Sequence, residues 1–279
     1  FGGTQINSFS ELNYNLNKER HNLNIGANLY TDQFKEREFI TPNLRNQYYT
    51  TFGGYVNHLW DVHEKFALET GFRTDYVMAN SAYGKSKGEA FYLPRISALY
   101  KVVKSFSIRA GGGMGYRMPT IFNEESEPYG YDGIDAIDFE SVTAERSYNG
   151  NIDFKFQSTF DTENILLSFN QMFFYNVIDN PVLLYQNGGL LTYQNSSGQV
   201  QSRGFESQIK LTFWKFTWFL GYTYTDAYLA LAGNEFGLTL TPIHSIKGDL
   251  LFVEDNKWRI GWDYELKSEQ LLSTGQLTP

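Results

Sequence analysis

The chain has 279 residues, of which 42% are hydrophobic and 17% aromatic. It contains no cysteine, which excludes a disulfide scaffold, a thiolate zinc site and a thiol nucleophile. The net charge of -8 argues against a nucleic-acid partner, because phosphate binding needs a basic face. No run of about 18 apolar residues is present, which excludes a transmembrane helix.

Strict alternation of apolar and polar residues is the main structural signal, and it fits a mean hydropathy of only -0.40. From residue 66 to 76, one face carries aromatic residues, a leucine and two threonines, and the other carries Glu69, Arg73 and Asp75. The same division recurs in 148–157 and 258–267. A strand with one apolar face and one polar face is therefore predicted for each of these segments.

Twelve segments of this kind follow one another along the chain. They lie near 5–16, 21–32, 48–60, 65–77, 91–101, 105–117, 147–157, 164–176, 200–211, 215–227, 244–253 and 258–267. Most of them have about 10 to 13 residues, which matches a tilted strand that crosses a membrane. Aromatic residues such as Trp218 and Trp258 lie near segment ends, where the aromatic girdles of outer-membrane barrels lie.

The connections between these segments alternate in length. Short polar turns are expected near 17–20, 61–64, 102–104, 158–163, 212–214 and 254–257. Long loops are expected at 33–47, 78–90, 118–146, 177–199 and 228–243. Short periplasmic turns alternating with long extracellular loops are typical of bacterial outer-membrane barrels. The prediction is therefore an all-β, antiparallel transmembrane barrel, in preference to a soluble β-sandwich.

This rhythm of loops places both ends of the chain on the extracellular side, whereas single-chain outer-membrane barrels normally begin and end in the periplasm. We therefore expect residues 1–279 to be a partial barrel that lacks flanking strands.

Several stretches resemble TonB-dependent outer-membrane receptors, in the C-terminal part of their barrel. Arg109-Ala110-Gly111-Gly112-Gly113-Met114-Gly115-Tyr116-Arg117-Met118-Pro119-Thr120 is similar to the family's glycine-rich strand that ends in G-[YF]-R-x-P-[ST]. Glu145-Arg146-Ser147, Gly204-Phe205-Glu206, Gly71-Phe72-Arg73-Thr74-Asp75 and Pro242-Ile243-His244 resemble further motifs in the family's order. This set of motifs resembles receptors from the Bacteroidetes more than the enterobacterial ones.

The resemblance implies about 12 strands of a barrel of about 22, located in the bacterial outer membrane. It implies active uptake of a scarce nutrient, most commonly a ferric siderophore or similar metal chelate, with cobalamin, haem or an oligosaccharide as further options. The implied partners are outer-membrane lipids, the small-molecule nutrient, the TonB complex, and a surface lipoprotein in some systems. The plug domain and the TonB-binding segment are not found in these residues. A passive porin or adhesin barrel and a soluble carbohydrate-binding β-protein are the alternatives.

The resemblance also implies ligand binding at the outer mouth, where the two richest loops are 118–146 and 177–199. The aromatic candidates for ligand contact are Tyr129, Tyr131, Tyr185 and Tyr193. Their alternative role is packing between loops. The candidates for contact with the plug or for pairing inside the lumen are Arg109, Arg117, Glu145 and Glu206.

Enzymatic and metal sites are not expected. The four histidines do not share metal-ligand spacing, and the acidic loop 118–146 lacks a spaced calcium-binding set. Gly84-Lys85-Ser86-Lys87-Gly88 fits G-x-S-x-G but lies in a polar loop, without the strand-to-helix turn that this motif needs. We predict no catalytic residue and no cofactor.

Overall fold

The computed structural model describes residues 2–37, 45–81, 86–123, 126, 129–131, 133–160, 165–254, 257–272 and 275–278. It contains one antiparallel sheet of 13 strands and a separate two-stranded hairpin. No helix within these residues is long and apolar enough to cross a membrane. The all-β antiparallel prediction is confirmed.

The strands are β1 (Gly3–Lys18), β2 (His21–Glu36), β3 (Gln47–His63), β4 (Phe66–Ser81), β5 (Ser86–Val103), β6 (Phe106–Arg117), β7 (Glu145–Phe160), β8 (Ile165–Asp179), β9 (Val182–Asn187), β10 (Leu190–Asn195), β11 (Gln199–Phe213), β12 (Phe216–Leu231), β13 (Asn234–Gly237), β14 (His244–Glu254) and β15 (Trp258–Lys267). Each of the twelve predicted segments lies within or largely overlaps one long strand of the sheet. The short strands β9, β10 and β13 lie in connections that the sequence predicted as long loops.

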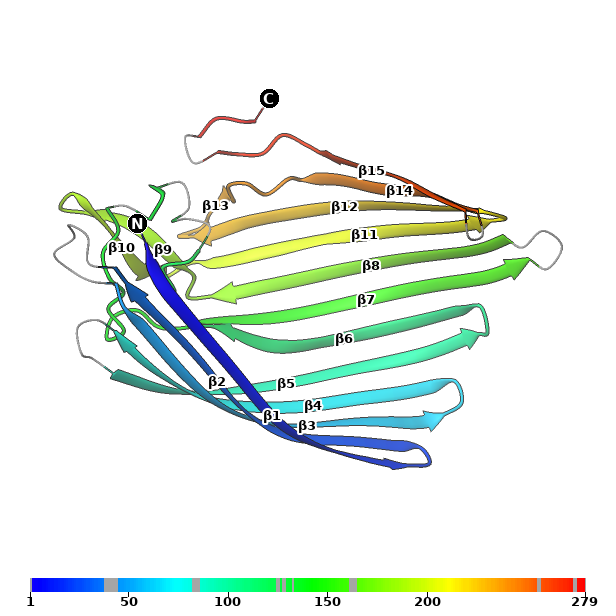
Figure 1. The fold of residues 1–279 in the computed structure, drawn as a ribbon, viewed down its shortest axis with the longest axis horizontal. Helices are drawn as coiled ribbons and strands as arrows, with labels where there is room; N and C mark the ends of the chain where they lie inside the picture. Colours follow the sequence, from blue (N-terminus) through cyan, green and yellow to red (C-terminus); the bar gives the residue numbers. More distant parts are fainter. Residues whose placement is uncertain are drawn as a thin grey trace.

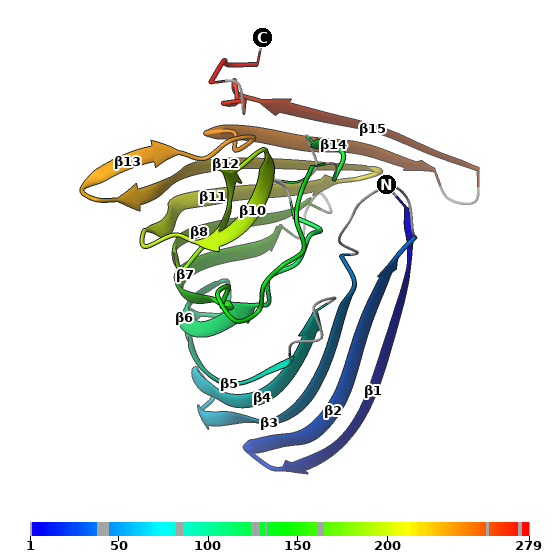
Figure 2. The ribbon, with the colours of Figure 1, turned by 90° about the vertical axis from the view of Figure 1, so that its left-hand side faces the viewer.

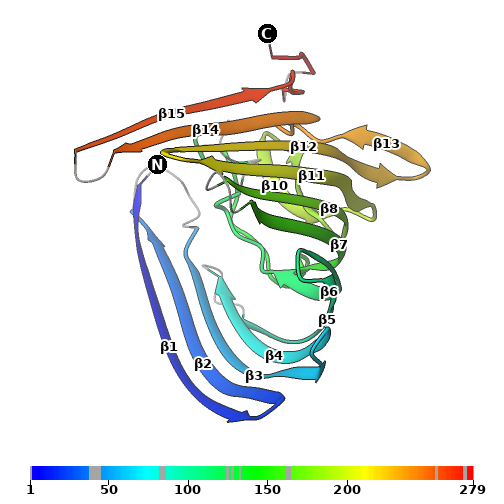
Figure 3. The same ribbon diagram turned by 90° about the vertical axis from the view of Figure 1, so that its right-hand side faces the viewer.

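The long strands form a meander in which each strand pairs with the next one in the chain. The order is β1-β2-β3-β4-β5-β6-β7-β8-β11-β12-β14-β15, and β13 pairs with β12. Figure 1 shows the strands side by side, with tight turns at one end and the longer connections at the other. The sheet curves strongly, and β1 and β15 lie at its two open edges (Figures 2 and 3). Among the described strands, β1 pairs only with β2 and β15 only with β14.

The two faces of the sheet follow the alternation in the sequence, because paired residues point to the same side. On the convex face, cross-strand pairing aligns Tyr14, Ile25, Val56 and Phe72 in one row. On the concave face, it aligns Glu11, Asn28, Gly53 and Asp75. In these rows, apolar side chains cover the outside and polar ones line the inside, as in a transmembrane barrel.

Gly53 shows why a glycine is needed in this polar inner row. A Cβ atom at this position would lie 2.4 Å from Asn28 Oδ1 and 2.5 Å from Arg73 Nη2. The missing side chain therefore leaves space for polar groups from the two neighbouring strands to meet over β3.

The connection expected at 78–90 is much shorter in the structure. β4 continues to Ser81 and β5 begins at Ser86, with Asn80 paired to Ser86 and Val77 to Glu89. A strand ladder needs only backbone groups, so it extends beyond the segment in which apolar side chains alternate.

Candidate functional site

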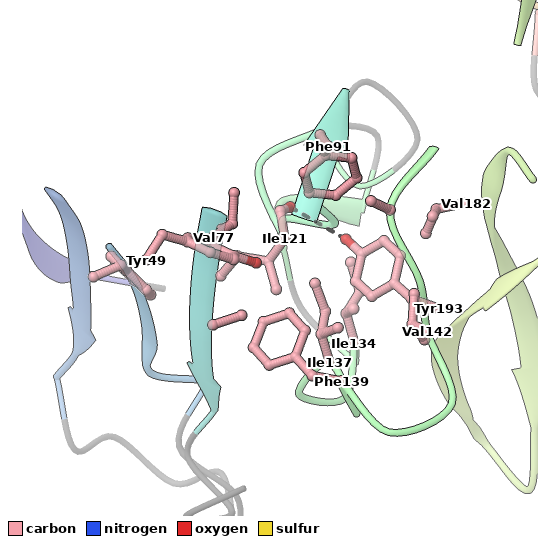
Figure 4. Close-up of a cluster of buried hydrophobic side chains, with 13 residues drawn as sticks. Tyr49, Val77, Phe91, Ile121, Ile134, Ile137, Phe139, Val142, Val182 and Tyr193 are labelled. Carbon is pink, nitrogen blue, oxygen red and sulfur yellow. Dashed lines mark hydrogen bonds between the residues drawn. The ribbon is translucent and has the colours of Figure 1, made fainter. Parts of the chain in front are cut away.

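The connection between β6 and β7 folds into the concave side of the sheet at the end with the long connections (Figure 2). Its apolar side chains form a buried core with inward-facing residues of β3, β4 and β5, including Tyr49, Val77 and Phe91. The buried contributors from the connection itself are Ile121, Ile134, Ile137, Phe139, Val142 and Ala144. Figure 4 shows these side chains converging between the sheet and the connection. We refer to the described part of residues 118–144 as the inner loop.

Hydrogen bonds hold the start of the inner loop in place. The Tyr49 hydroxyl donates to the Pro119 carbonyl, and the Tyr49 ring packs edge-on against Phe139 at 5.6 Å between centroids. The fully buried Ser126 hydroxyl donates to the Ile121 carbonyl at 2.6 Å. These contacts satisfy polar groups inside an apolar cluster, where an unpaired group would be costly.

The second long connection, between β8 and β11, carries the hairpin β9–β10 and joins the inner loop. The Asp135 amide donates to the Leu191 carbonyl at 2.8 Å, and the Leu191 amide donates to the Gly133 carbonyl at 2.8 Å. Asn195 adds a further link between the two loops, since its side chain accepts from the Thr143 amide at 2.7 Å and donates to the Thr143 carbonyl at 3.0 Å. The two loops predicted to be richest in binding groups therefore form one unit.

Two ion pairs fix this unit to the sheet. Arg117 Nε donates to Glu145 Oε2 at 2.6 Å, and the other oxygen of Glu145 accepts from the Val182 amide at 2.8 Å. Glu145 is 5% exposed, so its carboxylate is a buried link between β6, β7 and β9.

Arg45 and Glu36 form the second ion pair, with both side chains buried. Arg45 also donates to the carbonyl of Tyr131 in the inner loop. The Arg45 backbone amide also donates to Glu36 Oε2 at 2.8 Å, so this buried carboxylate is satisfied by one partner residue.

A pocket of about 630 Å³ lies between the inner loop and the concave wall. Its lining combines aromatic rings with polar and charged groups: Gln5, Phe9, Asn28, Tyr30, Asp32, Tyr49, Thr51, Arg73, Asp75, Tyr116, Met118, Thr120 and Phe122. Arg73 Nε donates to Asp75 Oδ2 at 2.9 Å and its Nη2 donates to Asn28 at 2.9 Å, while the Tyr116 hydroxyl donates to Asp75 at 3.0 Å. Tyr116 also stacks on Phe91 at 3.8 Å. Fixed polar groups beside rings suit the recognition of a ring-containing or chelate ligand.

The four predicted aromatic contacts occupy different environments. Tyr129 is 50% exposed and Tyr185 is 38% exposed, so both present ring surface to solvent. Tyr131 packs against Phe122 with 5.8 Å between ring centroids. Tyr193 is 4% exposed, and its hydroxyl donates to the Ile121 carbonyl at 3.2 Å. Ligand contact by any of the four stays a prediction.

The predicted lumen residues also separate into groups. Arg117 and Glu145 are paired as described, and Glu206 accepts from Gln208 on its own strand. Arg109 lies beside the glycines of β6 in a second wall pocket of about 400 Å³, where Arg95 pairs with Glu69 at 2.6 Å. Their contact with a plug stays a prediction.

Sequence reasoning missed the apolar core of the inner loop, because the acidic residues of 118–146 suggested a solvated loop. The available signal was the group of apolar residues at 134, 137, 139, 142 and 144, which is denser than a solvated loop needs. Arg45 was also missed, since nothing near it in the sequence indicates a partner in the inner loop. Within the described residues, no cluster of three or more potential metal ligands occurs.

Comparison with known proteins gives a consistent result. The family model "TonB dependent receptor-like, beta-barrel" matches residues 1–277. No curated protein sequence matches the chain significantly.

Solved structures share this fold. The iron transporter FrpB of Neisseria meningitidis is 18% identical, with a TM-score of 0.72 over 98% of this chain and 45% of its own. The copper transporter OprC is 13% identical, with a TM-score of 0.73 over 95% of this chain and 43% of its own. The siderophore receptor PirA of Acinetobacter baumannii is 16% identical, with a TM-score of 0.67 over 95% and 42%. The chain thus spans less than half the length of these structures, and at such identities the likeness shows the fold alone.

Proposed function

The chain belongs to the TonB-dependent receptor family, over the family's β-barrel domain, and on this premise we propose that it takes part in active uptake of a scarce nutrient across the bacterial outer membrane. The observation that carries the proposal is the inner loop, which is built into the lumen and creates a lined pocket there. A barrel for passive diffusion gains from an open lumen, whereas a receptor needs a ligand site inside its mouth.

The proposed substrate is a ferric siderophore or a similar metal chelate. Structurally similar proteins include an iron transporter, a copper transporter and a siderophore receptor, which supports this class. The pocket offers tyrosine and phenylalanine rings beside the Arg73–Asp75 pair, and this combination suits a flat, polar chelate. Cobalamin, haem and an oligosaccharide are the other substrates to be tested.

The proposed ligand contacts are the exposed rings of Tyr129 and Tyr185, together with Tyr131 and Tyr193, which pack within the unit formed by the two loops. The proposed contacts with a plug are Arg109, Arg117, Glu145 and Glu206 on the wall. We further propose that residues 1–279 are part of a larger barrel, and that the partners of the whole receptor are TonB and, in some systems, a surface lipoprotein.

Uptake of radiolabelled ferric chelates by cells that carry the intact protein tests this proposal. We expect saturable uptake that stops when a protonophore removes the inner-membrane gradient, because TonB-dependent transport draws energy from that membrane. Uptake that is unsaturable and unaffected by the protonophore would support a passive porin. Intact mass and N-terminal sequencing of the protein from outer membranes would show whether a plug-sized segment accompanies the barrel.

A further inference from the structure

The convex face of β1, β2 and β3 changes character toward the end with the tight turns. Cross-strand pairing places the residues of this face in successive rows, each with one residue from each strand. The rows are Tyr14, Ile25 and Val56, then Leu16, Leu23 and His58, then Lys18, His21 and Trp60. Apolar surface is thus replaced within two rows by a cation, two imidazoles and an indole.

The two histidines form a pair. His21 Nδ1 and His58 Nε2 lie 3.0 Å apart, and the rings are stacked with 5.2 Å between centroids. The His21 ring also stacks on Trp60 at 5.8 Å. Each imidazole uses one nitrogen in the shared hydrogen bond. When the pair carries one additional proton, His21 Nε2 and His58 Nδ1 are therefore both N–H donors outside that bond.

A groove of about 410 Å³ runs beside this pair on the same outer face. It is lined by Leu16, Lys18, His21, Leu23 and His58. Its leucines lie toward the apolar rows, whereas Lys18 and the imidazoles lie toward the turns. This order matches a phospholipid, in which a hydrocarbon chain is followed by a phosphate. Trp60 lies in the same row as Lys18 and His21, and indole side chains favour the boundary between membrane and water.

We propose that this groove binds one anionic glycerophospholipid from the leaflet at the tight-turn end of the barrel. Its phosphate contacts the Lys18 ammonium and the outer nitrogens of the histidine pair, and one acyl chain lies along Leu16 and Leu23. Charge complementarity selects an anionic lipid, since a cation near a membrane surface attracts acidic headgroups. The inference rests on the barrel lying in the outer membrane, which is part of the proposed function, but not on the transported substrate.

Another groove on the convex face provides a contrast. It has about 520 Å³ and is lined by Trp218, Leu250, Trp262 and Tyr264, without a charged side chain. It offers a surface for acyl chains but no cation to neutralise a phosphate. Selectivity for anionic lipid is therefore expected at the Lys18 groove and not at this one.

The test uses the intact protein in phosphatidylcholine nanodiscs with increasing phosphatidylglycerol, and native mass spectrometry counts the retained lipids. Lys18→Gln is expected to weaken phosphatidylglycerol retention about fivefold, the contribution of one cation at a membrane surface. The double variant His21→Gln/His58→Gln is expected to weaken it by a similar factor. Lys18→Arg keeps the charge and should retain the lipid.

His244→Gln is the matched control. His244 also lies on the convex face and is hydrogen-bonded to the Tyr222 hydroxyl at 2.9 Å, but it pairs with Tyr224 midway along β12, away from the tight turns. No change in phosphatidylglycerol retention is expected. The inference is overturned if Lys18→Gln and His244→Gln behave alike, if phosphatidylglycerol is retained no better than phosphatidylcholine, or if inorganic phosphate displaces the lipid. A protein that stays in solution without detergent would instead contradict the membrane location itself.

Discussion

At the scale of single residues, Glu145 contributes more to holding the site together than its partner Arg117 does. The Glu145 side chain is 6% exposed and links Arg117 to the Val182 amide, whereas the Arg117 side chain is 62% exposed. Water therefore screens the charge of Arg117, while the buried carboxylate is the group that needs both bonds. The ion pair serves to hold the start of β9 against β7.

Replacement of this carboxylate is the first prediction. Glu145→Ala should lower the free energy of unfolding by about 2–3 kcal/mol, because a hydrogen bond to a charged group is lost and the Val182 amide is left buried. Guanidinium titration of the protein in lipid vesicles measures the change. The control is Arg203→Gln, which removes a largely exposed ion pair with Asp226 and should cost at most about 1 kcal/mol. Equal losses in the two variants would contradict a special role for Glu145.

Tyr193 allows packing to be separated from ligand contact. Its ring is buried in the core and its hydroxyl bonds to the Ile121 carbonyl, so Tyr193→Phe should cost about 1 kcal/mol of stability. Tyr185→Phe, at an exposed ring, should cost almost nothing. Thermal unfolding in detergent compares the two. If Tyr193→Phe leaves stability unchanged but weakens chelate binding, the hydroxyl serves the ligand contact proposed above and does not stabilise the packing.

Sequence reasoning could identify these residues but not their environments. Glu145 is a candidate because it opens Glu145-Arg146-Ser147, which resembles a family motif, and Arg117 because it falls on the arginine of the glycine-rich motif; the structure adds that they bond to each other. The four tyrosines could not be ranked, because exposure depends on how two connections pack together through contacts such as Thr143–Asn195 and Ile121–Tyr193, which are 52 and 72 residues apart in the chain. The Arg45 contact with Tyr131 spans 86 residues and leaves no periodic signal.

At the scale of elements, the hairpin β9–β10 supports the inner loop from the side. Gly188 and Gly189 form its turn with positive φ angles of 57° and 96°, which residues other than glycine adopt only at a cost in conformational energy. In β10, the backbone of Leu191 then forms hydrogen bonds with the backbone of Gly133 and of Asp135. The turn therefore sets the register that allows the two connections to join.

A change in this turn gives the third prediction. Gly188→Val/Gly189→Val should strain the hairpin by about 1–2 kcal/mol per residue and loosen its bond to the inner loop. Hydrogen exchange at the Leu191 amide should become faster, while exchange in β7 and β8 stays unchanged. The control is Gly54→Val, at a position where an added Cβ atom meets nothing within 4 Å. Faster exchange throughout the sheet in the turn variant would show that the hairpin is required for the barrel itself.

Elements were the most predictable level of this protein. Alternation is a local property, so each of the twelve long strands could be located from residues within it. The ends of β4 and β5 could not, because their ladder extends into polar residues at 78–90. The hairpin β9–β10 was included in a long loop, although Asn187-Gly188-Gly189 between two short apolar runs is a hairpin signal.

At the scale of the whole molecule, the open edges of the sheet determine how it can exist in a membrane. β1 is exposed along all of its 16 residues, and β15 is almost as exposed. Unpaired backbone groups on a lipid-facing edge cost several kcal/mol each, so only closed barrels persist in hydrocarbon. The two edges must therefore pair in the membrane, either with each other or with further strands.

The last prediction distinguishes a barrel closed by direct pairing of β1 with β15 from a barrel closed through further strands. Because the chain has no cysteine, cysteines introduced at Leu12 and Ile260, both on the convex face, would be the only labelling sites in these residues. If β1 and β15 pair directly, their backbones lie about 5 Å apart, and spin labels on them would be strongly coupled. We expect weak or no coupling in the protein from outer membranes, because strands beyond residues 1–279 should separate these edges. Residues 1–279 expressed alone should then fail to give a protease-resistant barrel. Strong coupling would instead establish a closed barrel of twelve long strands and contradict the larger barrel proposed above.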